Sequence, residues 1–147
     1  MIGDDLKRHI ERLASCGLSP ADNLIAKHGT LFKPAHYPAH MKRGTPNLCF
    51  MNALHLHDEL GLDYVEGYAM RPMLGIPLEH AWCVDESGTV FDPTWNDPEE
   101  CAYLGVIIPD DILRAELQRL GHYGALFTWR GPNFDLVKLL EKELAGQ

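Results

Sequence analysis

Apolar residues recur every three or four positions in four stretches of the chain, which predicts amphipathic α-helices. These stretches are residues 4–16, 19–29, 109–120 and 133–144. Asp4 or Asp5, Ser19 and Asn133 are residue types that cap a helix N-terminus, and each precedes one of these stretches. Pro20 follows Ser19 at a position where proline is tolerated in a helix. We therefore expect two helices before the middle of the chain and two after it.

A fifth helix is predicted between Thr45 and Gly61, and it is apolar on most sides, as in a largely buried helix. Its apolar residues are Leu48, Phe50, Met51, Ala53, Leu54, Leu56 and Leu60. Thr45 can cap this helix with Pro46 in the first helical position, and Asn47 is the alternative cap. With either cap, Cys49 falls in the first turn.

Strand-forming residues predict a sheet after this helix. Residues 63–70 and 103–108 read as single strands, and residues 80–95 read as two short strands joined by the turn-forming residues 85–88. Residues 30–46, 71–77, 96–100 and 121–132 are predicted loops. Helices, then strands, then helices indicate an α+β fold with a small antiparallel sheet, a cysteine-bearing helix packed on it, and flanking helices.

Composition and charge narrow the classes of function. The 147 residues are 46% hydrophobic and 23% charged, which is typical of a globular domain, so we expect one domain over residues 1–147. A formal net charge of −8 argues against nucleic acid as a partner. No apolar run approaches the roughly 20 residues of a membrane span, and the acidic N-terminus lacks a signal-peptide core. We expect a cytoplasmic protein that binds no membrane; the pattern leaves the oligomeric state open.

Four cysteines occur without any CxxC spacing, which favours reduced thiols over disulfides or a zinc site. Cys49 is the candidate nucleophile because a helix N-terminus carries partial positive charge, which stabilises a thiolate. Cys83 alternates away from the face of His80 and is expected to be buried and inert. Cys16 and Cys101 receive no role.

A His and an Asp complete the candidate chemistry. His80 opens the first strand of the predicted hairpin, and the second strand carries Asp92 beside a proline, so the imidazole and the carboxylate can meet across the hairpin. Such a pair orients a general base for Cys49. Each residue alone also fits a structural role, as a packed cysteine, a satisfied histidine or a turn-forming aspartate. Their order and local setting together favour catalysis.

Four short motifs resemble the core of the transglutaminase-like superfamily. They are Cys49-Phe50 at a helix start, residues 64–68 ending in Gly-Tyr, His80-Ala81-Trp82, and residues 90–94 containing Asp-Pro-Thr. The resemblance covers roughly residues 45–107. It implies a papain-related fold and a Cys-His-Asp triad that acts on amide or thioester carbonyls. By matching position, these roles fall on Cys49, His80 and Asp92.

The resemblance implies a thiol-dependent acyl-transfer enzyme, such as an amide hydrolase, deamidase or peptidase, that needs no cofactor and acts on a protein or peptide-like amide. The chain lacks a glutamine shortly before Cys49, so the expected oxyanion donors are the backbone N–H of Cys49 and, less favoured, the Asn47 side chain. Two alternatives stay open: an acyltransferase of the arylamine N-acetyltransferase type, and a non-catalytic protein-binding module that keeps the fold.

Several other residues bear on the site. Trp82 shares the His80 face and fits either the core or a wall of the site, and Trp95 either lines the same cleft or packs. Glu66 and Glu79 flank the site and are expected to be solvated. A metal site is not expected: His55 and His57 diverge on a helix, and Pro38 argues against a helix that would join the histidines at 36 and 40.

Overall fold

The computed structural model describes residues 1–17, 19–128 and 131–146, and it has an α+β architecture. The α-helices are α1 (Ile2–Ser15), α2 (Pro20–His28), α3 (Cys49–Leu60), α4 (Asp110–Leu120) and α5 (Phe134–Ala145). The longer strands are β2 (Asp63–Met70), β3 (Leu78–Val84) and β5 (Ala102–Ile107), and the shorter ones are β1 (Thr30–Leu31), β4 (Val90–Phe91), β6 (Phe127–Thr128) and β7 (Gly131–Pro132). A 3₁₀ turn, η1 (Pro98–Glu100), precedes β5.

Five strands form one antiparallel sheet in the order β1-β5-β2-β3-β4. The sheet curls so far that its two ends meet: the backbone N–H of Lys33 donates to the carbonyl of Gly88, and that of Val90 donates to the carbonyl of Lys33, both at 2.9 Å. Gly67 and Gly105 lie opposite each other in the register of β2 and β5. A Cβ at Gly105 would lie 2.9 Å from the Trp82 ring, so glycine is required where the ring fills the concave side.

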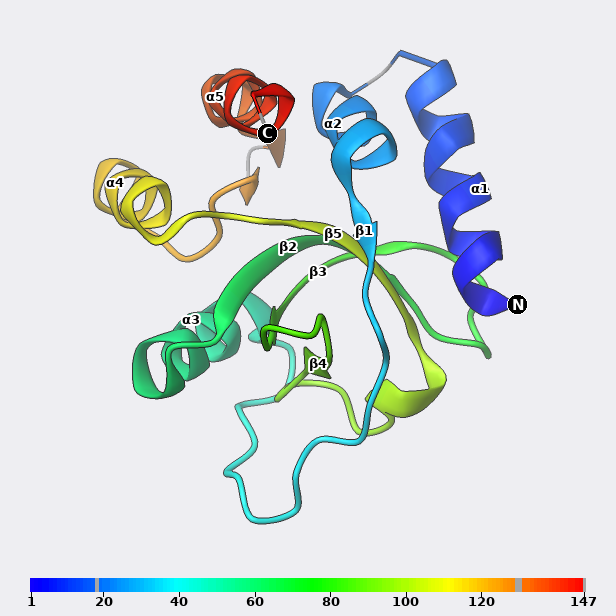
Figure 1. Cartoon of the computed structure of the whole chain (residues 1–147), viewed down its shortest axis with the longest axis vertical. Coiled ribbons are helices and arrows are strands. Elements are labelled where there is room, and N and C mark those ends of the chain that lie inside the picture. The colour runs from blue at the N-terminus through cyan, green and yellow to red at the C-terminus, as the bar shows by residue number, and fades with distance from the viewer. Residues whose placement is uncertain (18, 129–130, 147) are drawn as a thin grey trace.

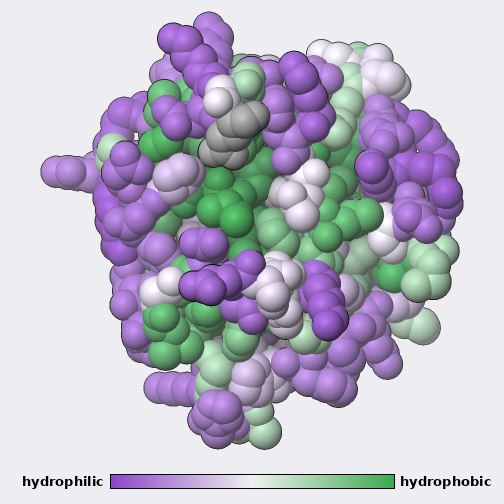
Figure 2. Space-filling view, viewed as in Figure 1, coloured by the Kyte–Doolittle hydropathy of each residue, from purple (hydrophilic) through white to green (hydrophobic). Residues whose placement is uncertain are grey.

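Side chains alternate between the two faces of this curled sheet. The convex face and all five helices share one buried cluster, which includes Leu6, Ile25, Leu56, Leu113 and Leu140. Figure 1 shows α1 and α2 beside each other over one end of the sheet, α4 and α5 over another part, and α3 at the lower left. In Figure 2 the apolar residues gather in the middle of the visible face, framed by hydrophilic residues.

The concave face holds a smaller cluster that is largely aromatic. Its buried members are Phe32, Val65, Ala69, Trp82, Val84, Val90, Trp95, Cys101 and Tyr103. Trp82 is fully buried, so its place is in this core. The concave cluster matters for function because His80 and Asp92 lie against it.

The predicted helices and the three main strands are confirmed, with differences at their ends. α3 begins at Cys49 with Leu48 as its N-cap and no side-chain cap, so the predicted caps Thr45 and Asn47 are wrong. Asn47 instead adopts a left-handed conformation, with φ at 67°, in the turn before the helix. Asn133 caps α5 as predicted, through its side chain and the N–H of Leu136.

The structure adds short strands in two predicted loops, β1 and the β6–β7 pair; residues 129 and 130, also in a predicted loop, lie outside the described residues. The second strand of the hairpin was predicted to carry Asp92, but β4 ends at Phe91 and Asp92 lies in the turn that follows it. Within the described residues, no helix is both long and apolar enough to cross a bilayer.

Candidate active site

Cys49 is the first residue of α3, at the end of the helix that faces the rim of the sheet. Its position follows from the chain around it: Asn47 reverses the backbone, and Leu48 is the last residue before the helix. The N–H groups of a first helical turn have no intrahelical acceptor and carry partial positive charge. The Cys49 side chain is partly accessible and lines an open pocket.

His80 lies on β3 with its side chain on the concave face, almost completely buried. Its Nε2 is 2.8 Å from Oδ2 of Asp92, which approaches from the turn after β4. The Cys49 side chain contributes to the raised pKa of His80, so the thiol lies close enough to the same ring to interact with it. Because Nε2 is occupied by Asp92, Nδ1 is the ring nitrogen left for the thiol. The structure therefore brings together the three residues predicted from sequence.

Asp92 is fully buried and accepts four hydrogen bonds. Its Oδ2 accepts from His80 and from the Tyr103 hydroxyl at 2.7 Å, and its Oδ1 accepts from the backbone N–H groups of Thr94 at 3.0 Å and Trp95 at 3.3 Å. Burial opposes ionisation of Asp92, but the charge of His80 and these donors hold its pKa below the ordinary value. The carboxylate is thus kept charged and fixed in orientation.

Electrostatics favour a protonated His80. Burial alone lowers the pKa of His80, but the charge of Asp92, its hydrogen bond and the hydrogen bond with Cys49 outweigh burial and raise the pKa to about 9. An imidazolium beside a thiol favours the thiolate, which is the nucleophilic form. A protonated His80 can therefore stabilise negative charge that develops on the Cys49 sulfur at the rim of the pocket.

Two tryptophan rings pack against the imidazole of His80 and restrict its orientation. Trp95 stacks on His80 with ring centroids 4.2 Å apart and planes at 26°, and Trp82 is stacked at 6.0 Å. The guanidinium of Arg71 lies 4.4 Å from the centroid of the Trp95 ring, which adds a cation–π contact. Trp95 was expected either to line the cleft or to pack, and it does both: it borders the Cys49 pocket and belongs to the buried cluster of the concave face.

The pocket beside Cys49 has a volume of about 450 Å³ and opens to solvent. Its lining residues are Asn47, Cys49, Tyr68, Pro77, Leu78, Glu79, His80, Thr94 and Trp95. Asn47 is exposed and borders the pocket, so it is placed near the thiol, as the predicted oxyanion role requires. The free N–H groups at the start of α3 provide the other donors.

Three residues that support the site were missing from the sequence analysis: Tyr103, Asn52 and Thr94. The Asn52 side chain accepts from the N–H of Thr45 at 3.1 Å and donates to the Thr45 carbonyl at 2.7 Å and to Thr94 Oγ1 at 2.9 Å. Asn52 thus ties the turn before Cys49 to the turn that carries Asp92. A polar residue amid the apolar positions of a buried helix was the available signal.

Glu66 corrects a prediction, because it is fully buried instead of solvated. Its two oxygens accept from the Tyr64 hydroxyl at 2.7 Å and from the backbone N–H groups of residues 125, 126 and 127 at 2.8, 2.9 and 3.1 Å. It anchors the segment after α4 to β2 on the convex face. Cys83 is buried as predicted, with its thiol donating to the carbonyl of Ala53.

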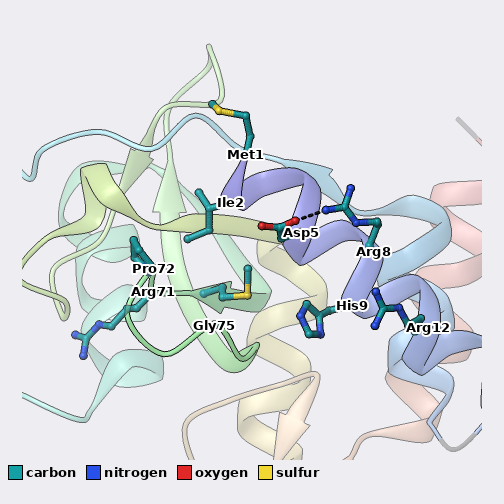
Figure 3. A pocket seen from close by; sticks show the side chains of 10 residues that line it. Met1, Ile2, Asp5, Arg8, His9, Arg12, Arg71, Pro72 and Gly75 are labelled. Carbon is teal, nitrogen blue, oxygen red and sulfur yellow. Dashed lines mark hydrogen bonds and ion pairs between the residues drawn. The ribbon is translucent and has the colours of Figure 1, made fainter.

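A separate pocket of about 370 Å³ lies between the start of α1 and the loop after β2 (Figure 3). Arg8 is paired with Asp5 there, while Arg71 extends away from the helix side of the pocket (Figure 3). Its lining residues include no cysteine, serine or threonine. Among the described residues, no three His, Cys, Asp or Glu side chains are grouped to hold a metal ion. The pocket at Cys49 is therefore the better candidate for chemistry.

Comparison of the chain with protein-family models, with curated proteins and with solved structures found no match. The geometry of Cys49, His80 and Asp92 accordingly carries the functional argument.

Proposed function

We propose that this protein is a thiol-dependent acyl-transfer enzyme with a transglutaminase-like core, acting on a peptide-like amide by hydrolysis or deamidation. The observation that carries the proposal is the meeting of Cys49 with a buried His80 whose Nε2 lies 2.8 Å from the Asp92 carboxylate. The order of elements supports the proposed core: a cysteine-bearing helix is followed by antiparallel strands that present the histidine and then the aspartate.

The proposed reaction has two steps. The Cys49 thiolate attacks the carbonyl carbon, and the new C–S bond pushes an electron pair onto the carbonyl oxygen. That oxygen faces the free N–H groups at the start of α3. When the intermediate collapses, the C–N bond breaks and the His80 imidazolium gives its proton to the leaving amine, which leaves a thioester on Cys49.

Water then resolves the thioester. Neutral His80 takes a proton from water as the oxygen attacks the thioester carbonyl, and the C–S bond breaks with its electron pair returning to sulfur. The acid leaves, and the thiolate–imidazolium pair is restored. Asp92 stays ionised throughout and stabilises the imidazolium in both steps.

The test compares two thiols of the same chain. Cys49 and Cys16 are both accessible and reduced, but only Cys49 adjoins an imidazole. We expect iodoacetamide at pH 6 to alkylate Cys49 at least about thirtyfold faster than Cys16, because an ordinary thiol is almost fully protonated there. Peptide mass mapping measures both rates. A Cys49 that reacts no faster than Cys16 would remove the basis of the proposal.

Turnover is then tested with p-nitrophenyl acetate. We expect a transient acetyl adduct on Cys49, detected by mass, and a return of the free thiol as water resolves it. The Cys49→Ser variant is expected to form no such thioester, and Cys101→Ser, which changes a buried thiol away from the pocket lining, is expected to form it at the wild-type rate.

A further inference from the structure

The pocket beside Cys49 has one acidic wall that the proposed chemistry does not use. Glu79 precedes His80 on β3 and lies opposite Tyr68 of β2 in the strand register. Because side chains alternate along a strand, Glu79 and Tyr68 share the convex side, while His80 faces the concave side. Both Glu79 and Tyr68 line the pocket. The pocket beside the thiol is therefore bordered both by the His80 imidazole and by a carboxylate from the other face of β3.

A second carboxylate, on α2, lies behind this wall and adds negative charge to it. Asp22 of α2 is only 5% exposed, and its Oδ1 accepts a hydrogen bond from the Tyr68 hydroxyl at 2.6 Å. Glu79 is exposed, but partial loss of solvent around its carboxyl, and then the charge of Asp22, raise its pKa, so the two carboxylates are close enough to repel each other. Within the described residues, no ion pair joins either carboxylate to a cation.

The remaining lining suits an aliphatic chain that ends in a positive charge. Pro77, Leu78 and Trp95 provide apolar surface beside Cys49, and no lysine or arginine lines the pocket. The aliphatic stem of a basic side chain packs on apolar surface while its charged end reaches a polar group. The favourable site for that end is the wall made by Glu79 and Tyr68.

We propose that this wall is a subsite for a cationic group, an ammonium or guanidinium, carried by the acyl donor that Cys49 attacks. The subsite rests on the proposed function, since it assigns the substrate class of the same thiol. Glu79 is the specificity-determining residue. Tyr68 and Asp22 are positioning residues that hold the wall negative and in place.

The test measures charge selectivity at Cys49 with two thiol reagents of similar size, one bearing a trimethylammonium group and the other a sulfonate, both methanethiosulfonates. The thiolate attacks the sulfenyl sulfur, a disulfide forms, and methanesulfinate leaves with the bonding electron pair. We expect the cationic reagent to react faster at Cys49, and Glu79→Gln to lower the cation-to-anion rate ratio about fivefold, the size expected for removing one charge beside a solvated site.

Two controls isolate the wall from general charge effects. Glu86→Gln makes the same change in net charge at the turn end of the same hairpin, away from the pocket, and is expected to leave the ratio unchanged. Cys16 in the same molecule is expected to keep its ratio in all variants. An unchanged ratio at Cys49 in Glu79→Gln, or an equal fall in Glu86→Gln, overturns the subsite.

A second measurement assigns the cation to the acyl donor. The p-nitrophenyl esters of Nα-blocked lysine and of norleucine differ only by the ammonium group, and we expect the lysine ester to acylate Cys49 about fivefold faster, an advantage lost in Glu79→Gln. Equal rates overturn the assignment. Failure of the subsite is distinguishable from failure of the thiol chemistry, because wild-type Cys49 is expected to keep its advantage over Cys16 toward uncharged iodoacetamide whether or not the two esters differ in rate.

Discussion

Two buried carboxylates, Asp92 and Glu66, lie on opposite faces of the curled sheet, and they are bound in nearly the same way. Each accepts a tyrosine hydroxyl at 2.7 Å and at least two backbone N–H groups. They differ in the remaining partner: Asp92 has the ring of His80, whereas Glu66 has a third backbone N–H. Only the first network contains a group that can accept and release a proton beside an open pocket.

The pKa values of the two carboxylates are also shifted in opposite directions. The positive ring of His80 helps hold the pKa of Asp92 below its ordinary value, whereas burial raises the pKa of Glu66 despite its four donors. Glu66 has only uncharged donors, which do not offset the loss of water around a buried charge. Burial of a carboxylate therefore does not identify a functional site by itself. What distinguishes Asp92 is that its partner reaches a thiol.

Replacing each carboxylate with its amide distinguishes the two networks, and it gives the largest expected effect on the reactivity of Cys49. Asp92→Asn removes the charge that keeps His80 protonated, so we expect alkylation of Cys49 by iodoacetamide at pH 6 to slow about thirtyfold, to the rate of an ordinary thiol such as Cys16. Glu66→Gln is expected to leave the rate at Cys49 within about twofold of wild type, because no partner of Glu66 borders the Cys49 pocket.

The matched control is the free energy of unfolding, which Glu66→Gln is expected to lower. Glu66→Gln replaces one acceptor oxygen with an amide N–H₂, which then faces two donors, either the N–H groups of residues 126 and 127 or the Tyr64 hydroxyl and the N–H of residue 125. The variant is therefore expected to lower the free energy of unfolding by about 3 kcal/mol. Urea unfolding measures this change. If Glu66→Gln slowed Cys49 as much as Asp92→Asn, the contrast between a structural and a functional carboxylate would be wrong.

The pH dependence of the unfolding free energy tests the charge on the His80 ring, which distinguishes the Asp92 network from the Glu66 network. The pKa of His80 is raised in the folded protein to about 9 from its ordinary 6.5. A raised pKa stabilises the folded state below about pH 6.5, and this contribution is lost as the pH rises through about 9. We therefore expect the unfolding free energy of wild type to exceed that of His80→Gln by about 3 kcal/mol more at pH 6 than at pH 10.

Urea unfolding at both pH values checks this sign. Titrating groups that do not interact with His80 are common to the two proteins, so their contributions cancel in the difference. A stability advantage of wild type over His80→Gln that grows between pH 6 and pH 10 would mean that His80 is neutral in the folded protein, and the thiolate–imidazolium pair would have no basis.

Local patterns were sufficient to predict the parts of the site that lie within one element or one hairpin. The helix start at Cys49 follows from a loop-forming run before an apolar periodic stretch, and the approach of His80 to Asp92 follows from hairpin geometry, since both strands flank one turn. The element type was right in each case. The caps at Thr45 and Asn47 failed because tertiary contacts of the turn, made by Asn52, outweigh capping preference.

The rest depends on strand order, which no local pattern contains. Tyr103 reaches Asp92 because the curl of the sheet brings β5 toward the turn after β4 across the concave side. Glu66 is buried because the segment at 125–127, about 60 residues along the chain, presents three N–H groups to it. An isolated carboxylate in a strand gives no sign of such donors, so solvation was the natural expectation.

The prediction with the smallest expected effect asks whether the hydrogen bond between Asn52 and Thr94 stabilises the fold or supports the reactivity of Cys49. Thr94→Val keeps the shape and the backbone N–H that donates to Asp92, but removes the hydroxyl that accepts from Asn52. We expect a loss of about 1 kcal/mol in unfolding free energy. Cys49 alkylation is expected to change less than about threefold, because His80 keeps its carboxylate. Urea unfolding measures the stability, and peptide mapping measures the alkylation rate. A large loss of Cys49 reactivity with little loss of stability would mean that Thr94, like Asp92, supports the reactivity of Cys49 and not only the stability of the fold.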